Sequence, residues 1–412
     1  MKKKRFKKLI LIFIVILLII GGIAAFIFMF NEAPSNETVN NDEPIVSLQE
    51  PVEITISAVG DIMMHMPQIT AARNRDGSYD FNNNFKYVRS IFEESDLSIG
   101  NLETTFGGPP YRGWPLFSAP AALAPALKNA NFDVIVTVNN HSVDRGRTGL
   151  LRTIEVLENY DLIVSGTRAD DNQPRYAMFE TQGVKIAIVA YTYASTFSNG
   201  DLNINGIRAQ DSRHLLNYFR YTHLDTDLPN VEETINDARE SGADIVIVFY
   251  HWGNEYVLQS NHYQRRIARR TVDMGADMIF GSHPHVLQEA VYLTNEETGR
   301  DVPVFYSLGN FISNQRYETL NHFTPNARHT EIGAIAQVRV AFDMNEREIK
   351  EIEKSAIPTW VERQRSGGNW VYTIIPLDEN LESNSILRAS GNLARAQRAL
   401  TSAISTLAIN GS

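Results

Sequence analysis

Short apolar runs alternate with amphipathic stretches from about residue 53 to residue 360. The apolar runs have the length of buried strands, and the amphipathic stretches repeat with the period of a helix. Strands are predicted at Ile54–Val59, Leu97–Ile99, Val134–Val138, Leu162–Val164, Lys185–Ala190, Ile245–Tyr250, Met278–Phe280, Val304–Tyr306 and Ile335–Phe342. Helices are predicted at Asn84–Glu94, Pro120–Ala130, Arg147–Asn159, Val231–Ser241 and Asn261–Met274. This alternation predicts an α/β fold with mostly parallel strands.

The same pattern sets the expected domain boundaries. Residues 53–360 contain no linker-like break, so they are expected to form one large domain. Residues 361–412 are expected to form a C-terminal extension, which ends in an amphipathic helix over Ser385–Leu407. Two arrangements of that helix are open, one docked on the domain and one free of it.

The longest apolar run, residues 9–30, carries no charge. At a rise of about 1.5 Å per residue it would span about 33 Å as a helix, enough to cross a bilayer. It is longer than the apolar part of a cleaved signal peptide, so an uncleaved transmembrane anchor is expected. The basic segment 1–8 then lies in the cytoplasm, and everything after Phe30 is extracellular at the cell membrane. Residues 31–52 are rich in Asn, Glu, Pro and Ser and predict a flexible extracellular linker.

Charge and composition narrow the function further. The chain has 38 basic and 48 acidic residues, and six of the basic ones precede residue 9, so the remainder carries 32 against 48, a net −16. A surface this acidic argues against nucleic-acid binding. The chain has no cysteine, which excludes disulfides and thiolate chemistry. Any metal ion must therefore be held by His, Asp, Glu or Asn side chains.

Polar clusters follow six of the predicted strands. They are Gly60–Asp61, Gly100–Glu103, Asn139–Gly146, His251–Glu255, Gly281–His285 and Ser307–Phe311. Parallel strands bring their carboxyl ends to one edge of the sheet, where ligands bind. Four of the ten histidines fall in these clusters, and His283 and His285 should point to the same side of an extended backbone. Together the clusters predict a metal or polar catalytic centre.

Each cluster also has a structural interpretation. A single His at a strand end is commonly held by one hydrogen bond, and Gly-Asp or Gly-Asn pairs commonly form turns. Four arginines, Arg265, Arg266, Arg269 and Arg270, form a basic stripe on a predicted helix. That stripe is typical of a solvated face paired with acids, and the alternative is a contact for a polyanion or for lipid headgroups.

Six motifs in this order resemble the CapA family of capsule-synthesis proteins, also called PgsA, from bacteria that produce poly-γ-glutamate. The motifs are GD at 60–61, NLE at 101–103, NNHSVDRG at 139–146, HWGNEY at 251–256, GSHPHV at 281–286 and SLGNF at 307–311. The resemblance spans roughly residues 53–315. It implies a membrane-bound, outward-facing subunit that works with an amide ligase and small membrane proteins to make and export poly-γ-glutamate.

The CapA family is in turn similar to calcineurin-like metallophosphoesterases. That similarity implies an αββα two-sheet sandwich with a site for one or two divalent cations, Mn, Zn, Fe or Mg. The implied metal ligands are Asp61, Glu103, Asn140, His251, His283 and His285. His141, oriented by Asp144, is the implied acid–base group, with Glu255 as a second candidate. Asn101 and Asn310 complete the expected pocket.

Three positions depart from the phosphoesterase pattern. Met63 stands where a ligand His is expected, Asn101 where a bridging Asp is expected, and Ser142 where an acid follows the Asn-His pair. A neutral Asn in place of a bridging carboxylate should hold two cations less tightly. One metal ion, an altered reaction, or no metal are all open.

Three hypotheses about function follow. The first is an assembly or export subunit for poly-γ-glutamate or another anionic polymer. The second is a free-standing cell-surface metal-dependent hydrolase of phosphoester or amide bonds. The third is a non-catalytic binding scaffold. Metal content separates the third from the other two, and neighbouring genes for a ligase and a small membrane protein favour the first.

Overall fold

The computed structural model describes residues 51–366 and 368–408. The predicted cytoplasmic segment 1–8, the anchor 9–30 and nearly all of the linker 31–52 lie outside the described residues. Within the described ranges, no helix is both long enough and apolar enough to cross a bilayer.

The first sheet has eight strands in the order β17-β16-β15-β1-β2-β3-β4, and β14 pairs with β1. Strands β1 to β4 are parallel to one another, whereas β15, β16 and β17 continue the sheet in antiparallel order. The bounds are β1 Val52–Ile62, β2 Leu97–Leu102, β3 Val134–Val136, β4 Ile163–Ser165, β14 Asn310–Ile312, β15 Ile332–Asp343, β16 Glu348–Ser366 and β17 Asn369–Pro376.

The second sheet has nine strands in the order β12-β13-β11-β10-β6-β7-β8, and β5 and β9 also pair with β6. Its centre, β6-β10-β11-β13, is parallel. The bounds are β5 Tyr176–Thr181, β6 Val184–Thr196, β7 Leu202–Ile204, β8 Ile207–Arg208, β9 Tyr218–Arg220, β10 Ile245–His251, β11 Met278–Ser282, β12 Ala290–Thr294 and β13 Asp301–Phe305.

The helices lie between these strands along the chain. The α-helices are α2 Met66–Ala71, α3 Asn82–Phe85, α4 Arg89–Glu93, α5 Leu123–Asn129, α6 Gly146–Glu158, α7 Leu224–Glu240, α8 His262–Asp273, α9 Tyr317–Leu320, α10 Ser385–Ser390 and α11 Leu393–Leu407. The 3-10 helices are η1 Arg213–Leu215, η2 Tyr221–His223, η3 Ala327–Glu331 and η4 Leu381–Ser383.

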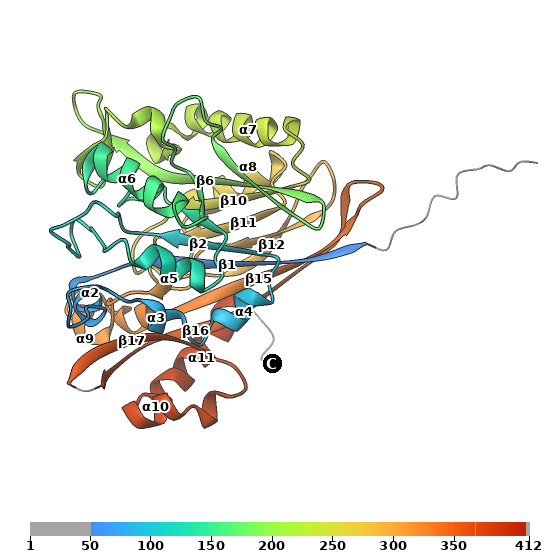
Figure 1. Cartoon of the computed structure of the whole chain (residues 1–412). Coiled ribbons are helices and arrows are strands. Elements are labelled where there is room, and N and C mark those ends of the chain that lie inside the picture. Colours follow the sequence, from blue (N-terminus) through green and yellow to red (C-terminus); the bar gives the residue numbers. More distant parts are fainter. Residues whose placement is uncertain (1–50, 367, 409–412) are drawn as a thin grey trace, which may run out of the picture. The chain divides into compact units, whose positions relative to one another are not determined.

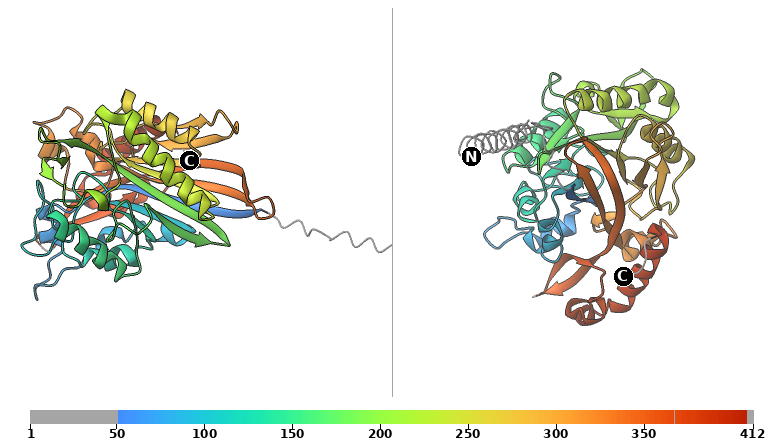
Figure 2. Two further views of the ribbon diagram at one scale, coloured as in Figure 1. Left: turned by 90° about the horizontal axis from the view of Figure 1, so that it is seen from above. Right: turned by 90° about the vertical axis from the view of Figure 1, so that its right-hand side faces the viewer.

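Strand β6 shows why the two sheets pack face to face. Alternate side chains of a strand point to opposite faces, and Ile186 and Ile188 join a core that also contains Ile54 and Ile56 of β1. Ala187, which lies between them, belongs instead to the core beneath α7 and α8, as does Val189. A third core lies between the first sheet and α3 to α5. The order is therefore helices, sheet, sheet, helices (Figure 1), and the same layers are visible edge-on in Figure 2. The predicted mixed α/β fold with two sheets is confirmed.

Two predicted helices are each divided in the structure. The helix predicted over Asn84–Glu94 is two short helices, α3 and α4, with a turn over residues 86–88 between them. Within α3, the Asn84 side chain donates a hydrogen bond of 2.7 Å to the Tyr372 carbonyl of β17. The helix predicted over Ser385–Leu407 is divided at Gly391, whose φ of 74° ends α10. Helix α11 buries Ala396, Ala399, Ala403 and Leu407.

The C-terminal strands were not predicted. Strand β16 runs without interruption from Glu348 to Ser366, across the boundary that the sequence predicts at residue 360. It lies between β15 and β17, and it gives the first sheet its antiparallel half.

Candidate metal centre

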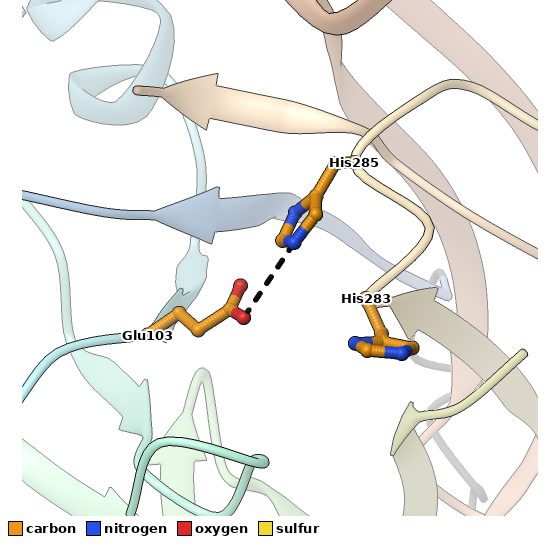
Figure 3. A group of neighbouring side chains, drawn as sticks. All are labelled: Glu103, His283 and His285. Carbon is orange, nitrogen blue, oxygen red and sulfur yellow. Dashed lines mark ion pairs between the residues drawn. The ribbon is translucent and has the colours of Figure 1, made fainter. Parts of the chain in front are cut away.

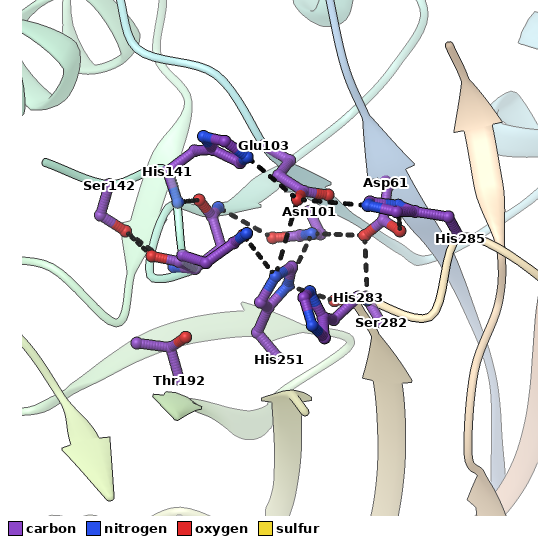
Figure 4. Close-up of polar contacts among 12 residues, drawn as sticks. Asp61, Asn101, Glu103, His141, Ser142, Thr192, His251, Ser282, His283 and His285 are labelled. Atoms are coloured by element: carbon purple, nitrogen blue, oxygen red, sulfur yellow. Dashed lines mark hydrogen bonds and ion pairs between the residues drawn. The ribbon is translucent and has the colours of Figure 1, made fainter. Parts of the chain in front are cut away.

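Loops from both sheets place their polar side chains in one buried cluster (Figure 4). The first sheet supplies Asp61 from the end of β1 and Glu103 from just beyond β2, and the second sheet supplies His251 from the end of β10. The cluster contains all but one of the predicted site residues, and these are almost wholly buried: Asp61, Asn101, Glu103, Asn140, His141, Asp144, His251, His283, His285 and Asn310. The predicted convergence of strand ends is what brings them together.

The backbone of the His-Pro-His segment differs from the prediction. The expected extended conformation is wrong, because His283 has a φ of 96° and His285 a φ of 58°. Both values lie in the left-handed region, which costs a non-glycine residue about 1–3 kcal/mol. The segment turns sharply after β11, and the two imidazole centroids lie 5.9 Å apart beside the cluster. Strain of this kind is commonly stored at functional sites.

Hydrogen bonds fix the orientation of the acid and imidazole side chains. Asp61 Oδ1 accepts a hydrogen bond of 2.9 Å from the Asn101 amide, and Asp61 Oδ2 lies 2.9 Å from His285 Nδ1. His251 Nε2 lies 2.8 Å from Asn140 Oδ1, and its Nδ1 lies 3.0 Å from the hydroxyl of Ser282. The side chains are thus held before any ligand binds.

Glu103 is the unusual member of the cluster. Its side chain is fully buried, yet neither carboxylate oxygen has a hydrogen-bond partner. Oε1 lies 3.7 Å from His251 Nε2 and 3.9 Å from Nε2 of both His141 and His285. These distances are too long for hydrogen bonds. They are close to the separation of two ligand atoms that share one ion, since each would lie about 2.0–2.2 Å from it.

The donor set therefore fits a divalent cation. Ligand atoms of Glu103, His283 and His285 lie within 4.8 Å of one another (Figure 3), and so do those of Asp61, Glu103 and His251. His283 Nδ1 is also buried without a partner. Buried polar atoms without partners are costly, and a cation held by carboxylate and imidazole groups would satisfy them.

The electrostatics of the cluster favour the same ligand. Burial, and then the charge of Asp61, raise the pKa of Glu103 well above its ordinary value. Burial acts to raise the pKa of Asp61 as well, but the hydrogen bond and charge of His285 hold it below its usual range. Burial lowers the pKa of His283 to about 3, and burial and the neighbouring imidazoles lower that of His251. Neutral imidazole is the form that binds metal ions.

His141 and Asp144 form a pair at the rim of the cluster. His141 Nδ1 lies 2.7 Å from Asp144 Oδ2, which also accepts a hydrogen bond of 2.6 Å from the Phe117 N–H. Nε2 of His141 therefore faces Glu103. This arrangement leaves one ring nitrogen free to hold or take a proton, with the other oriented by a buried carboxylate.

Glu255 is the one predicted site residue outside the buried cluster. It is exposed and lines a cavity of about 340 Å³ together with Trp114, Tyr256 and Phe323. The ring of Tyr256 lies 5.9 Å from that of His285, so the cavity adjoins the cluster. Among the described residues Glu255 has no hydrogen bond to any predicted metal ligand.

The structure shows what surrounds each of the three residues that depart from the phosphoesterase pattern. Asn101 replaces a charge with an amide that supports Asp61. The hydroxyl of Ser142 lies 2.7 Å from the carbonyls of Thr137 and Asn139, so it holds the turn that carries His141. Met63 is buried, and its N–H donates to the Ile312 carbonyl at 2.9 Å.

Two supporting residues, Asn139 and Tyr193, were not predicted to be metal ligands, acid–base groups or pocket residues. The Asn139 amide bridges Asn101 and the Leu102 carbonyl, and its oxygen accepts from the His141 N–H. The ring of Tyr193 packs 4.8 Å from that of His283. Asn139 stands inside the NNHSVDRG motif, so the sequence already marked its segment as part of the site. The position of Tyr193 depends on the pairing of strands that are distant in sequence, which the motif pattern does not reveal.

Gly60 shows how closely the strands approach at this edge. A Cβ added there would lie 2.1 Å from the Gly309 carbonyl oxygen, and the N–H of Asp61 donates to that same carbonyl at 2.9 Å. Glycine is therefore required for β1 and the 307–311 segment to meet, and this contact places Asp61 beside Asn310.

The family model and the similar curated proteins agree on one family for this chain. The family model described as bacterial capsule synthesis protein PGA_cap matches residues 55–315. The PGA biosynthesis protein CapA of Bacillus subtilis (strain 168) is 29% identical over 306 residues, covering 71% of this chain and 70% of that one. The capsule biosynthesis protein CapA of Bacillus anthracis is 30% identical over 279 residues, covering 66% of this chain and 62% of that one.

Among solved structures, a phosphatase from Mycoplasma pneumoniae aligns with a TM-score of 0.42 at 14% identity. The alignment covers 75% of this chain and 94% of that one. A likeness this distant assigns no chemistry to the present chain.

Proposed function

The chain belongs to the bacterial capsule synthesis protein family PGA_cap, and on that premise we propose that it is a membrane-anchored, extracellular subunit for poly-γ-glutamate synthesis and export. The family match over residues 55–315 carries this proposal, because that range contains every residue of the buried cluster. The names of the two Bacillus relatives, both called CapA, support capsule polymer as the product.

The proposed cofactor is one or two divalent metal ions, whose identity is open among Mn, Zn, Fe and Mg. Asp61, Glu103, Asn140, His251, His283 and His285 would hold the metal. A cation there would act as a Lewis acid on a carbonyl or phosphoryl oxygen of a bound substrate. His141 would hold or take a proton at Nε2, while Asp144 keeps the ring oriented.

The uncharged run 9–30 supports a single membrane anchor with the N-terminus in the cytoplasm. The proposed partners are the membrane, the anionic polymer, an amide ligase and small membrane subunits. Nucleic acid is not a proposed partner, given the net charge of −10.

A second candidate is a free-standing cell-surface metal-dependent hydrolase. The His141–Asp144 pair favours it, because a pure scaffold has no need for an oriented imidazole beside a ligand cluster. His141→Ala is expected to lower a catalysed rate about 10²–10⁴-fold. If His141→Ala melts the domain but the folded fraction keeps full activity, His141 is structural.

Complementation tests the proposed function. In a poly-γ-glutamate-producing strain without its own copy, the full-length gene should restore cell-associated and released polymer. Asp61→Asn should restore little, whereas Asp225→Asn, at an exposed carboxylate on α7, should restore as much as the wild type. A wild-type protein that accumulates in the membrane but restores no polymer would exclude this function.

A further inference from the structure

A second cavity lies apart from the candidate metal centre. It has a volume of about 410 Å³, within the range of about 300–1,000 Å³ typical of ligand sites. Its lining comes from the loop before β5 and from β6, η1, β9 and α7, and it includes Arg175, Arg213, His214, Tyr218, Asn230 and Glu233. None of the predicted metal ligands lines it.

A buried arginine stands behind this cavity. Arg168 is 4% exposed, and its guanidinium donates to Asn217 Oδ1 at 2.8 Å and to the carbonyl of His214. Its Nε has no partner, and among the described residues it forms no ion pair with a carboxylate. A buried cation with only neutral acceptors is costly unless an anion lies nearby.

A second guanidinium converges on the same acceptor. Arg175 Nη1 lies 3.4 Å from Asn217 Oδ1, so one amide oxygen serves two cations. The amide nitrogen of Asn217 donates to the carbonyls of Arg175 and Ala190, which fixes the oxygen toward the two arginines. Burial, and then the charge of Arg175, lower the pKa of Arg168 to about 10. The two positive charges therefore repel each other, and among the described residues no carboxylate forms an ion pair with either.

The remaining charges leave the cavity cationic. Arg213 donates to the Tyr218 hydroxyl at 2.7 Å, and Arg147 contacts His214. The nearby carboxylates are Glu233 in the lining and Asp171, whose charge acts on Arg168. Neither forms an ion pair with these arginines within the described ranges.

The basic stripe of α8 differs from the cavity because most of its arginines are paired with carboxylates. Arg266 and Arg270 share the carboxylate of Asp225, and Arg269 pairs with Asp273. These contacts favour the solvated-face interpretation of the stripe. Three of the four arginines of the stripe are thus paired with carboxylates, whereas among the described residues Arg168, Arg175 and Arg213 form no ion pair.

We propose that this cavity is a second, metal-independent site that binds the carboxylates of a γ-linked glutamate segment. Guanidinium groups bind carboxylates through paired hydrogen bonds, and Arg175 and Arg213 present two such groups to one cavity. The choice of glutamate rests on the proposed function. Since the chain is acidic as a whole, a polyanion needs a local cationic site of this kind to bind at all.

Binding of a fluorescein-labelled oligomer of γ-linked glutamate to the full-length protein in detergent, with excess EDTA, tests this site. Wild type should bind, and an Arg175→Ala, Arg213→Ala double variant should bind roughly tenfold or more weakly, since it loses charged hydrogen bonds. The matched control is Arg266→Ala, Arg270→Ala, which removes the same charge from an exposed helix. The control should change affinity by less than about twofold, because exposed pairs contribute little.

Three results would overturn the inference: no binding in EDTA, equal losses in both double variants, or displacement of the oligomer by inorganic phosphate at concentrations where free γ-glutamate has no effect. The last would make the cavity a phosphate site. Complementation by the same variants keeps the two proposals apart. If wild type restores polymer and binding is unchanged in Arg175→Ala, Arg213→Ala, this site is wrong and the proposed function stands.

Discussion

Glu103 links the two groups of candidate ligands, because its carboxylate belongs to both. The glutamate stands after β2, where a loop carboxylate is unremarkable in sequence, yet it is fully buried among three imidazole nitrogens. A carboxylate in that position is stabilised by a cation and is costly without one. The candidate metal centre therefore depends on this side chain more than on any single histidine.

Substitution of Glu103 should reduce the stabilisation of the protein by a divalent cation. Glu103→Gln keeps the shape but removes the charge, so the rise in melting temperature that Mn²⁺ causes in wild type should be largely lost. Thermal unfolding of the full-length protein with Mn²⁺ and with EDTA measures the effect. Glu362→Gln, at a buried carboxylate bonded to Trp360, should keep the full Mn²⁺ shift. An undiminished shift in Glu103→Gln would show that Glu103 is not a ligand.

The sequence predicts the position of a site residue well where the order of the strands alone determines that position. Asp61 and His251 stand at the carboxyl ends of β1 and β10, and Asn140 follows β3, all of them in parallel pairing, so their convergence follows from the alternation of apolar runs. The left-handed backbone of His283 and His285 was not predictable from the sequence, because it depends on the tertiary contacts of a loop. Glu255 is exposed, and its role as a second acid–base group stays a prediction.

At the scale of elements, the described C-terminal part of the chain is tied to the first sheet by an ionic contact. Glu331 of η3 is 1% exposed, and it lies 2.7 Å from Arg316 Nη2 and 2.6 Å from Arg395 Nη2 of α11. Asn392 also donates to Glu362 of β16. These contacts and the buried alanines of α11 make the helix part of the domain.

Removal of Arg395 tests this link. Arg395→Ala leaves the buried Glu331 with one partner fewer, which should lower the free energy of unfolding by about 1.5–3 kcal/mol. Arg398→Ala, one turn further along α11 at an exposed position, should change it by less than about 0.5 kcal/mol. Urea unfolding followed by circular dichroism measures both. Equal and small changes in the two variants would mean that α11 adds little stability.

The elements also show where sequence patterns stop being informative. Central strands such as β10 are apolar from Ile245 to Phe249 and were predicted closely, since both faces are buried. Strand β16 was missed because its charged residues, among them Glu351, Glu353 and Lys354, obscure a strand that has partners on both sides. The contact of Asn84 in α3 with Tyr372 of β17 joins segments far apart in sequence, so a local pattern does not reveal it.

For the whole molecule, the proposed topology places the described domain outside the cell. The six basic residues before position 9 and the uncharged run 9–30 are the basis for it. Protease added to intact protoplasts should therefore remove the domain, and a cytoplasmic marker should survive. A domain that is protected until lysis would contradict the extracellular assignment.

The most direct test of the account is the metal content of the full-length protein, purified in detergent and dialysed, by elemental analysis. One or two equivalents of Mn, Zn or Fe are expected, or of Mg where that is the cation supplied. A His283→Ala, His285→Ala variant with an unchanged circular dichroism spectrum should contain almost none, because it loses two ligand atoms of the cluster. A folded wild-type protein without metal after incubation with each cation, or a variant with undiminished metal, would contradict the candidate metal centre.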